Sequence, residues 1–407
     1  MGRFIINGGK ALSGEISVSG SKNAALPIIF AAITIKGISK IHNVPDISDV
    51  NVALDILSSF GAKISRFNGD LIIDSRELYY SIPSESLVSK IRASSYLLGA
   101  TLARFGHSLV RFFGGCNFDS RPIDMHLSCA EAVGAKIDGI ELKASRLCGA
   151  DIIFDKISVG ATVNALIMTA NADGVSRIFG YAKEPHVMSL IDYLRNAGAD
   201  ITVNDEYISV VGASLSSAEA YIIPDMIEAG TYINLSLMTG AKLRVNGAEL
   251  SQLESFLKPL VLSGASFDYS GSSLIPTNEI LRSVEIITAP YPSFPTDLQP
   301  QCAPLLASFF GGSIREGVWH NRFGYLAELS KFGVLSDVYN GYAKIYSSKI
   351  KPACASAPDL RGGAALLLAA LAANGESVIE NADVIKRGYA DVINKLTGIG
   401  ASIYEIQ

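Results

Sequence analysis

One pattern recurs six times along the chain: an amphipathic stretch ends in Gly-Ala or a close variant, and an alternation of apolar and polar residues follows it. The glycines of these endings are Gly61, Gly134, Gly198, Gly264, Gly333 and Gly400. A glycine after an amphipathic stretch is typical of a helix C-terminus, and an alternating stretch with polar turn residues is typical of a β-hairpin. The 407 residues therefore divide into copies of one unit, of roughly 68 residues each.

The first half of each copy also recurs, as an apolar stretch that stops at a glycine before a short strand-like segment. These glycines are Gly37, Gly106, Gly174, Gly240, Gly312 and Gly375. They precede the glycine of their own Gly-Ala by 24, 28, 24, 24, 21 and 25 positions, respectively. Two helices and about four strands per copy predict an α/β fold, and six copies divide naturally into two domains of three.

The composition narrows the class of protein. The formal net charge of −5 gives no general electrostatic reason to bind nucleic acid. Five cysteines without metal-ligand spacing argue against a disulfide framework and a zinc site, and they favour a reducing cytoplasm. The longest apolar runs, Ala24–Ile35 and Ala364–Ala373, are too short to span a bilayer. We expect a cytoplasmic protein without a metal site.

Lys22, Arg92 and Arg361 lie where three of the apolar helices are expected to begin. A helix N-terminus carries unpaired N–H groups and a partial positive charge, so a cation there is unfavourable unless an anion lies nearby. The pattern therefore suggests a phosphate or carboxylate ligand. For any one of these residues alone, the alternative is a side chain that simply reaches water.

The second copy is four residues longer than its neighbours and contains the glycine-rich segment FFGGCNFDSRPIDMH, residues 112–126. Cys116 follows two glycines there, and Arg111, Arg121 and His126 lie in the same stretch. A thiol near cations has a lowered pKa and is a better nucleophile or proton donor near neutrality. The alternative is that Cys116 is a small buried residue.

Asp297 follows three prolines in the segment APYPSFPTDLQPQ, residues 289–301. A carboxylate on a stiff segment could act as a general base, or it could be the N-cap of the fifth copy's apolar helix. Near the end of the chain, Lys386 and Arg387 precede the last helix. On local grounds alone, these two cations indicate a solvated helix start.

Taken together, Lys22-Asn23, the GGC loop that continues into RPID, the PTD segment ending at Asp297 and the late RGY starting at Arg387 resemble the enolpyruvyl transferase family. The resemblance runs essentially from end to end of the chain. It implies an inside-out α/β barrel architecture of two similar domains, each of three βαβαββ units. Residues 22–223 would form the domain with the Cys116 loop, and residues 1–21 plus 224–407 would form the second domain.

The resemblance also implies an activity, the transfer of the enolpyruvyl group of phosphoenolpyruvate to the 3′-hydroxyl of UDP-N-acetylglucosamine with release of phosphate. This reaction is the first committed step of peptidoglycan synthesis, and so serves cell wall biogenesis, cell shape and division. No cofactor, nucleic acid, membrane or obligate protein partner is implied. The alternatives are another acceptor, UMP or shikimate 3-phosphate, and a non-catalytic paralogue that binds the nucleotide sugar.

By the same resemblance, Lys22 and Asn23 contact phosphoenolpyruvate, and Arg92, Arg121 and Arg387 hold its phosphate and carboxylate. Cys116 would protonate the methylene carbon or form an adduct, and Asp297 would remove the proton of the sugar hydroxyl. The nucleotide sugar would contact Arg92, Arg121, Pro122, Ile123, Asp124, Met125, Lys156, Ser158, Val159, Gly160, Asp297 and Val318. Asn321-Arg322-Phe323 and Asp359-Leu360-Arg361 match family segments that we assign to the framework of the substrate domain.

Three residues depart from the family pattern. Asp119 replaces a usual glycine and is expected to stiffen the loop beside Cys116. His186 and Met226 stand where acidic and arginine residues are common, so substrate contacts or interdomain pairing could differ. The domains are expected to close on the nucleotide sugar, and Trp319, the sole tryptophan and next to Val318, is expected to report this closure by fluorescence.

Overall fold

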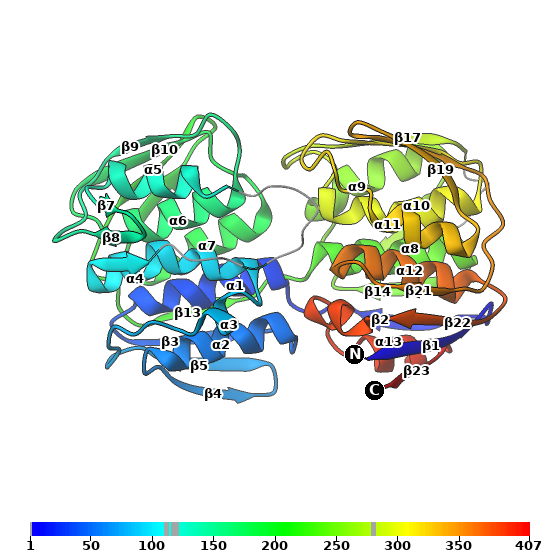
Figure 1. Cartoon of the computed structure of the whole chain (residues 1–407), viewed down its shortest axis with the longest axis horizontal. Coiled ribbons are helices and arrows are strands. Elements are labelled where there is room, and N and C mark those ends of the chain that lie inside the picture. The colour runs from blue at the N-terminus through cyan, green and yellow to red at the C-terminus, as the bar shows by residue number, and fades with distance from the viewer. Residues whose placement is uncertain (1, 110–113, 115–121, 278–281) are drawn as a thin grey trace. The chain divides into compact units, whose positions relative to one another are not determined.

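The structure is a computed structural model of the chain, and it describes residues 2–109, 114, 122–277 and 282–407. Contacts between Cα atoms divide it into two compact units (Figure 1). Unit 1 contains residues 2–19 and 224–407, and unit 2 contains residues 20–223 apart from the loop outside the description. Cys116, Asp119 and Arg121 lie outside the described residues, as does Arg111.

Unit 1 consists of three copies of the repeat. The first comprises β2 (Gly14–Ser17), α8 (Met226–Thr239), β14 (Leu243–Asn246), α9 (Leu250–Ser263), β15 (Ser266–Ser270) and β16 (Ser273–Thr277). The second comprises β17 (Val284–Thr288), η3 (Thr296–Leu298), α10 (Gln299–Ser308), β18 (Gly312–Glu316), α11 (Tyr325–Leu329), η4 (Ser330–Phe332), β19 (Leu335–Tyr339) and β20 (Tyr342–Tyr346). The third comprises β21 (Cys354–Ser356), α12 (Leu360–Ala372), β22 (Gly375–Glu380), η5 (Ala382–Arg387), α13 (Val392–Gly398), β23 (Ser402–Ile406) and β1 (Arg3–Gly8).

Unit 2 also contains three copies. The first comprises β13 (Ala218–Tyr221), α1 (Lys22–Ala31), η1 (Ala32–Thr34), β3 (Ile38–His42), α2 (Ser48–Ser59), β4 (Lys63–Phe67) and β5 (Asp70–Asp74). The second comprises α3 (Glu85–Val88), η2 (Arg92–Tyr96), α4 (Leu97–Phe105), β6 (His107–Leu109), α5 (Asp124–Ala132), β7 (Lys136–Asp138) and β8 (Glu141–Lys143). The third comprises β9 (Asp151–Ile153), α6 (Val159–Thr169), β10 (Val175–Phe179), α7 (Pro185–Asn196), β11 (Asp200–Val203) and β12 (Tyr207–Val211).

Five of the six sheets have four strands in one common arrangement, and the sheet of the second copy in unit 2 has three strands in the described part of the chain. In each four-stranded sheet the first strand runs parallel to the second, and the remaining two strands are antiparallel to their neighbours. This is the predicted βαβαββ repeat, and the predicted fold class is confirmed.

Three strands complete sheets whose other strands lie far away in the sequence. β1 lies between β22 and β23, β2 pairs in parallel with β14, and β13 pairs in parallel with β3. In the β2–β14 pair Ile16 lies opposite Val245, and in the β13–β3 pair Ala220 lies opposite Ile41, so apolar residues face each other in both registers. Each unit is therefore closed by strands from its own sequence ends.

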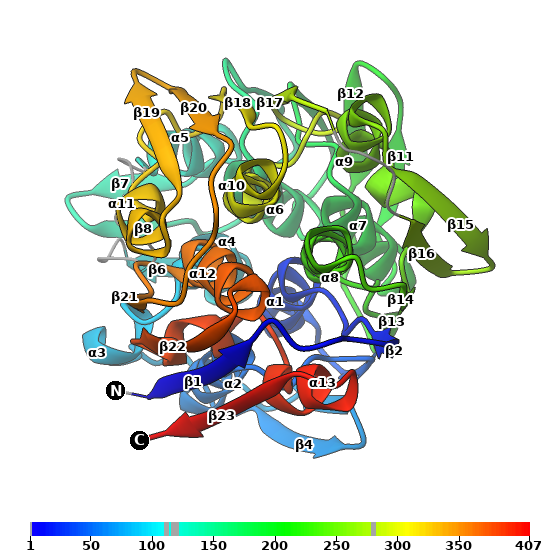
Figure 2. The ribbon, with the colours of Figure 1, turned by 90° about the vertical axis from the view of Figure 1, so that its right-hand side faces the viewer.

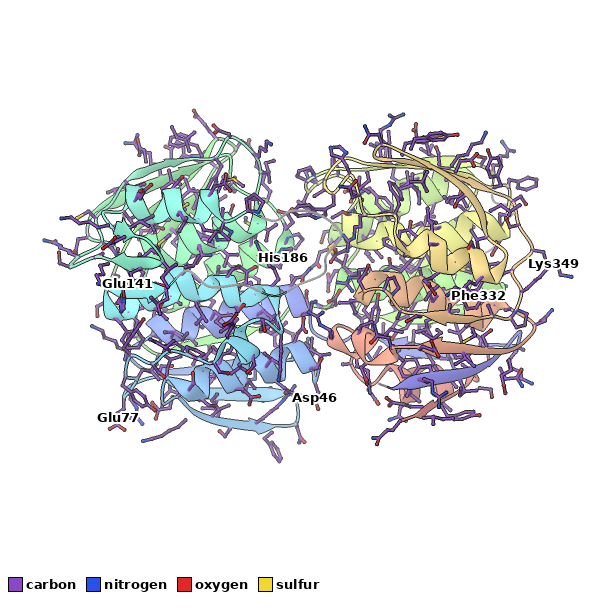
Figure 3. All side chains as sticks on the ribbon, in the orientation of Figure 1. Asp46, Glu77, Glu141, His186, Phe332 and Lys349 are labelled. Carbon is purple, nitrogen blue, oxygen red and sulfur yellow. The ribbon has the colours of Figure 1, made fainter. Side chains whose placement is uncertain are left out.

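The core of unit 1 is formed by α8, α10 and α12, which are buried along nearly their whole length. Figure 2 looks toward these helices, with the sheets of the unit arranged around them. The helix α9 is amphipathic and buries one face, as the 3.6-residue period requires. Elsewhere in unit 1, apolar side chains such as Phe332 are buried, and charged side chains such as Lys349 are exposed (Figure 3).

The glycines of the Gly-Ala endings adopt the conformation that the sequence predicts. All six have positive φ, between 87° and 117°, which only glycine adopts at no steric cost after a helix. In the first half of the fifth copy the prediction is one residue off, because Gly311 has the positive φ and Gly312 begins β18. Among the described residues, no helix is both long and apolar enough to cross a membrane.

Candidate active site

In unit 2, Lys22 is the first residue of α1, as predicted, and Asn23 follows it half-buried. The Lys22 Nζ atom lies 3.3 Å from Oδ2 of Asp49, a residue of the first turn of α2 that is only 4% exposed. This carboxylate offsets part of the cost of a cation at a helix N-terminus. The pair presents a mostly buried ammonium group, held in place by a neighbouring helix.

Arg92 does not begin an α-helix, so this prediction is corrected in detail. It begins the 3₁₀ helix η2, which continues into the apolar helix α4. Its side chain is half-buried, and this burial lowers the pKa of the guanidinium, while the neighbouring Tyr96 opposes the change. Burial also raises the pKa of Tyr96 to about 12. A partly desolvated guanidinium of this kind gains more from an anionic ligand than an exposed one does.

The buried amide of Asn164, on α6, joins three other elements of unit 2. Its Oδ1 atom accepts a hydrogen bond from the Gly99 backbone N–H at 2.8 Å, and its Nδ2 atom donates to the Ser95 carbonyl at 3.1 Å. The same Nδ2 atom lies 2.7 Å from Nδ1 of His126. Because Gly99 donates to Oδ1, the amide cannot be reversed without placing two donors against each other.

His126 is therefore neutral and carries its proton on Nε2, because Nδ1 must accept from Asn164. Burial and the nearby Arg92 lower the pKa of His126 to about 4, although Asp124 acts in the opposite direction. The sequence places His126 in the same stretch as the cations near Cys116, but the structure corrects its expected charge, because the buried imidazole is neutral. A Cβ atom at Gly160 would lie 3.0 Å from Cε1 and 3.2 Å from Nε2 of His126, so a larger residue there would require the imidazole to shift.

Eight further residues predicted to bind the nucleotide sugar lie near two helix starts of unit 2. Ser158 is the N-cap of α6, and its side chain accepts from the Ala161 N–H at 3.3 Å. Asp124 is exposed at the start of α5, after the exposed Pro122. Ile123, Met125, Val159 and Gly160 are half-buried, and Lys156 is exposed.

In unit 1, Asp297 lies between two buried arginines. Its Oδ1 atom accepts from Arg322 Nη1 at 2.8 Å, and its Oδ2 atom accepts from Arg361 Nε at 3.2 Å and Nη2 at 3.0 Å. The side chains of Arg322 and Arg361 are 5% and 3% exposed. Burial lowers the pKa of Arg361, but the charges of Asp297, Tyr389 and Asp225 together with the hydrogen bonds to Asp297 hold that pKa above its ordinary value.

Asp297 is not the N-cap of the fifth copy's apolar helix, so that alternative is wrong. The N-cap of α10 is Leu298, and neither η3 nor α10 has a side-chain cap. In contrast, Asp359 caps α12 by accepting from the N–H groups of Arg361 and Gly362, both at 2.9 Å. A cap therefore starts the helix that carries Arg361, and the guanidinium is free to turn toward Asp297.

The Arg361 guanidinium also lies over the ring of Tyr389, 5.7 Å from its centroid. The Tyr389 hydroxyl lies 2.9 Å from Thr231 Oγ1 and accepts from Gln301 Nε2 at 3.1 Å. The Nη1 atom of Arg361 is buried and has no hydrogen-bond partner in the described part of the chain. The two guanidinium groups thus share the Asp297 carboxylate, and the NH₂ group at Nη1 of Arg361 can serve an anionic ligand.

Two further predicted residues lie in unit 1 near these elements. Arg387 is half-buried at the end of η5, two residues before Tyr389. The backbone N–H of Val318 donates to Glu316 Oε1 at 2.9 Å. The sequence analysis did not identify Glu316, although its signal was present: alternation along β18 places it on the same face as the buried Ile314.

A family model described as EPSP synthase (3-phosphoshikimate 1-carboxyvinyltransferase) matches residues 6–396. The chain belongs to the EPSP synthase family of enolpyruvyl transferases. It is 40% identical to a UDP-N-acetylglucosamine 1-carboxyvinyltransferase of Halothermothrix orenii, over 100% of both chains. It is 39% identical to a protein of the same name from Wolbachia pipientis, over 98% of both. The enolpyruvyl transferase NikO from Streptomyces tendae has a similar structure, with a TM-score of 0.90 and 28% identity over 100% of this chain and 99% of that one.

Two departures of this enolpyruvyl transferase from the family pattern lie in the described residues. Met226 is the first residue of α8, where its side chain packs against the core of unit 1. His186 follows Pro185 in the first turn of α7 and is half-buried (Figure 3).

Cys129 and Cys302 are buried thiols whose pKa burial raises to about 12, while Cys148 and Cys354 are exposed. Cys148 interacts with one nearby cation, Arg146, and Cys354 with another, Lys331.

Proposed function

We propose that this protein transfers the enolpyruvyl group of phosphoenolpyruvate to the 3′-hydroxyl of UDP-N-acetylglucosamine and releases phosphate. The observation that carries the proposal is full-length similarity, at 40% and 39% identity, to relatives named UDP-N-acetylglucosamine 1-carboxyvinyltransferase. The reaction opens peptidoglycan synthesis, and hence serves growth of the cell wall, cell shape and division. We place it in the cytoplasm.

The side chains of unit 1 support a role in binding the carboxylate of phosphoenolpyruvate and the acceptor hydroxyl. The spare Nη1 atom of Arg361 offers a charge-assisted hydrogen bond to a carboxylate. Asp297 is held as an anion by three hydrogen bonds from arginine, and it retains lone pairs for the sugar hydroxyl. Arg387 adds positive charge, since phosphoenolpyruvate carries about three negative charges.

In this proposal the sugar oxygen attacks C2 of phosphoenolpyruvate while Asp297 takes the hydroxyl proton. Cys116 gives a proton to the methylene carbon, which becomes a methyl group in a tetrahedral intermediate. Loss of phosphate and of one methyl proton then restores the double bond. Lys22, Asn23, Arg92 and Arg121 stabilise the phosphate, and residues 22–223 act as the domain that carries the Cys116 loop.

A panel of acceptors tests the activity. We expect phosphate release from phosphoenolpyruvate with UDP-N-acetylglucosamine, and little with UMP or shikimate 3-phosphate. Faster turnover with either of the other acceptors would reassign the substrate. Tight binding of the nucleotide sugar by calorimetry without any turnover would instead indicate a non-catalytic paralogue.

The role of Cys116 has a separate test. Cys116→Ala should lose most activity at neutral pH, by at least about a hundredfold. Cys116→Asp should recover part of it, because a carboxyl group can also donate a proton, and it should resist thiol alkylators. If the alkylator inactivates wild type and Cys116→Asp equally, the assignment of this thiol is wrong.

A further inference from the structure

The carboxylate of Glu316 connects two segments that carry predicted substrate contacts. It lies at the end of β18 and is 1% exposed. Its Oε1 atom accepts from Thr288 Oγ1 at 2.6 Å, from Val318 N at 2.9 Å and from Trp319 N at 3.0 Å. Its Oε2 atom accepts from Thr296 Oγ1 at 2.9 Å. The Val318 and Trp319 N–H groups can only donate, so Oε1 must accept, and the two threonine hydroxyls donate to the same side chain.

Thr296 passes this interaction on to Asp297. Its hydroxyl proton goes to Glu316, so the oxygen is left to accept from Arg322 Nη1, which lies 3.0 Å away. The same Nη1 atom donates to Asp297 Oδ1 at 2.8 Å. The direction of the Thr296 hydroxyl, which Glu316 sets, therefore contributes to the placement of the Arg322 guanidinium and through it of the Asp297 carboxylate.

We infer that Glu316 is a positioning residue that holds Asp297 and the Val318 backbone in register for the acceptor sugar, an inference that rests on the proposed function. It does not contact substrate in this assignment. Asp297 would meet the reacting hydroxyl, and Val318 would meet another part of the same nucleotide sugar. One buried carboxylate thus aligns two groups that contact the same ligand. Supporting hydrogen bonds of this kind can hold such groups to within a few tenths of an ångström of the productive geometry.

Glutamine at this position cannot satisfy the same neighbours. An amide nitrogen placed toward Val318 and Trp319 would face two N–H donors, so the nitrogen must face Thr296 instead. The Thr296 oxygen would then accept from both the new amide and Arg322, and its own proton would lose its acceptor. The change is nearly isosteric, and it acts on the route from Thr296 to Asp297.

The experiment compares Glu316→Gln with Glu228→Gln in the full-length protein. Glu228 is also 1% exposed in unit 1, and it accepts from Ser19 N, Tyr232 Oη and Lys395 Nζ. Glu316→Gln should lower kcat and raise the KM for UDP-N-acetylglucosamine, with kcat/KM reduced about ten- to a hundredfold. Glu228→Gln should lower the melting temperature at least as much as Glu316→Gln does, because the Lys395 ammonium group loses its paired carboxylate. It should nevertheless leave kcat/KM within about twofold of the wild type.

A double-mutant cycle tests the route. Thr296→Val should cause a similar loss, Thr296→Ser should restore activity, and Glu316→Gln combined with Thr296→Val should be no worse than the poorer single variant. Fluorescence of Trp319, titrated with the nucleotide sugar, reports binding independently of turnover. Additive losses, or unchanged kinetics in Glu316→Gln, would overturn the inference. Absence of turnover in the wild type would instead overturn the proposed function.

Discussion

The two units hold their candidate ligand-binding groups in different ways. In unit 1 the groups are charged: Asp297 lies between the buried Arg322 and Arg361. In unit 2 the central group is a neutral amide, Asn164, which holds a neutral imidazole, His126. The Asp297 cluster of unit 1 therefore keeps buried charge in place through opposite charge, as the Lys22–Asp49 pair of unit 2 also does. The Asn164–His126 pair of unit 2 instead fixes a protonation state through burial and hydrogen bonding.

Because the Asp297 cluster is charged and the Asn164–His126 pair is neutral, substitutions in these two places should have different effects. Removing one member of a buried charged cluster leaves an uncompensated charge, which weakens the fold as well as the site. Removing or changing a neutral hydrogen-bonding group alters which atom carries a proton, and the consequence depends on pH. The predictions below test this contrast in order of decreasing effect.

The largest effect is expected for Asp297→Ala. Arg322 and Arg361 would remain buried with less compensating charge, so the free energy of unfolding should fall by about 4 kcal/mol. Urea denaturation at pH 7 measures this fall. The exposed Asp268 in the same unit gives a control, since Asp268→Ala should change the free energy by less than about 0.5 kcal/mol. Equal stability of wild type and Asp297→Ala would remove the distinction between the units.

His126 should make unit 2 sensitive to acid. Its pKa is lowered from 6.5 to about 4 in the folded protein, so the unfolded chain binds the proton first as the pH falls. Stability from this group is therefore complete above pH 6.5 and declines toward pH 4, by on the order of 3 kcal/mol. His126→Gln should abolish this part of the decline, as measured by denaturation at a series of pH values.

His42 in the same unit provides a control of opposite sign. Hydrogen bonds to Glu219 and Asp70 raise its pKa above 6.5. Its contribution to stability should be present below pH 6.5 and should disappear as the pH rises through the folded-state value. If His42→Gln and His126→Gln changed the pH profile in the same direction, the protonation states assigned here would be wrong.

A smaller effect is expected when the neutral amide of unit 2 is made charged. In Asn164→Asp the carboxylate would still accept from Gly99 and would now also accept from a protonated Nδ1 of His126. The pKa of His126 should rise by about two units or more, which ¹⁵N NMR of the imidazole can follow. Asn171 lies two residues after the end of α6, where its side chain donates to the Ile167 carbonyl. Asn171→Asp is the control and should leave the His126 titration unchanged. An unshifted His126 in Asn164→Asp would contradict the tautomer derived from Asn164.

The smallest effect is expected for Tyr389→Phe in unit 1. The ring under Arg361 remains, and only the hydroxyl bonded to Thr231 and Gln301 is lost. The free energy of unfolding should fall by about 1 kcal/mol. Tyr193→Phe, which removes an equally buried hydroxyl near Ser39 in unit 2, should cost a similar amount. A much larger loss in Tyr389→Phe would mean that the charged cluster depends on this hydroxyl.

The repeat was predictable because its signals are local. Glycine is favoured after an amphipathic helix mainly because it adopts positive φ without steric cost, and all six Gly-Ala glycines have positive φ. The fifth copy shows the limit of this prediction. Gly311 and Gly312 are adjacent, and the sequence alone does not indicate which of them has positive φ. The partners of Asp297 were harder, since Arg361 lies 64 positions away on another helix.

The polar networks were largely missed for the same reason. Asn164 lies within the apolar stretch VGATVNALIMT, where it could have been noticed as a polar residue in a buried helix. Its partners, however, lie on three other elements, and the sequence does not show that Gly99 sets the direction of its amide. Glu316 was detectable by strand alternation as an inward-facing carboxylate, but its bond to Thr296 required the fold.

The pairing of β1 with β22 and β23 has a consequence for synthesis on the ribosome. All described strands of unit 2 have left the polymerisation site once residue 221 has been added. β1 is made before every strand of unit 2, yet its partner strands end at residues 380 and 406. Unit 2 can therefore fold while the chain is still growing, whereas β1 of unit 1 stays unpaired until β22 and β23 have been translated.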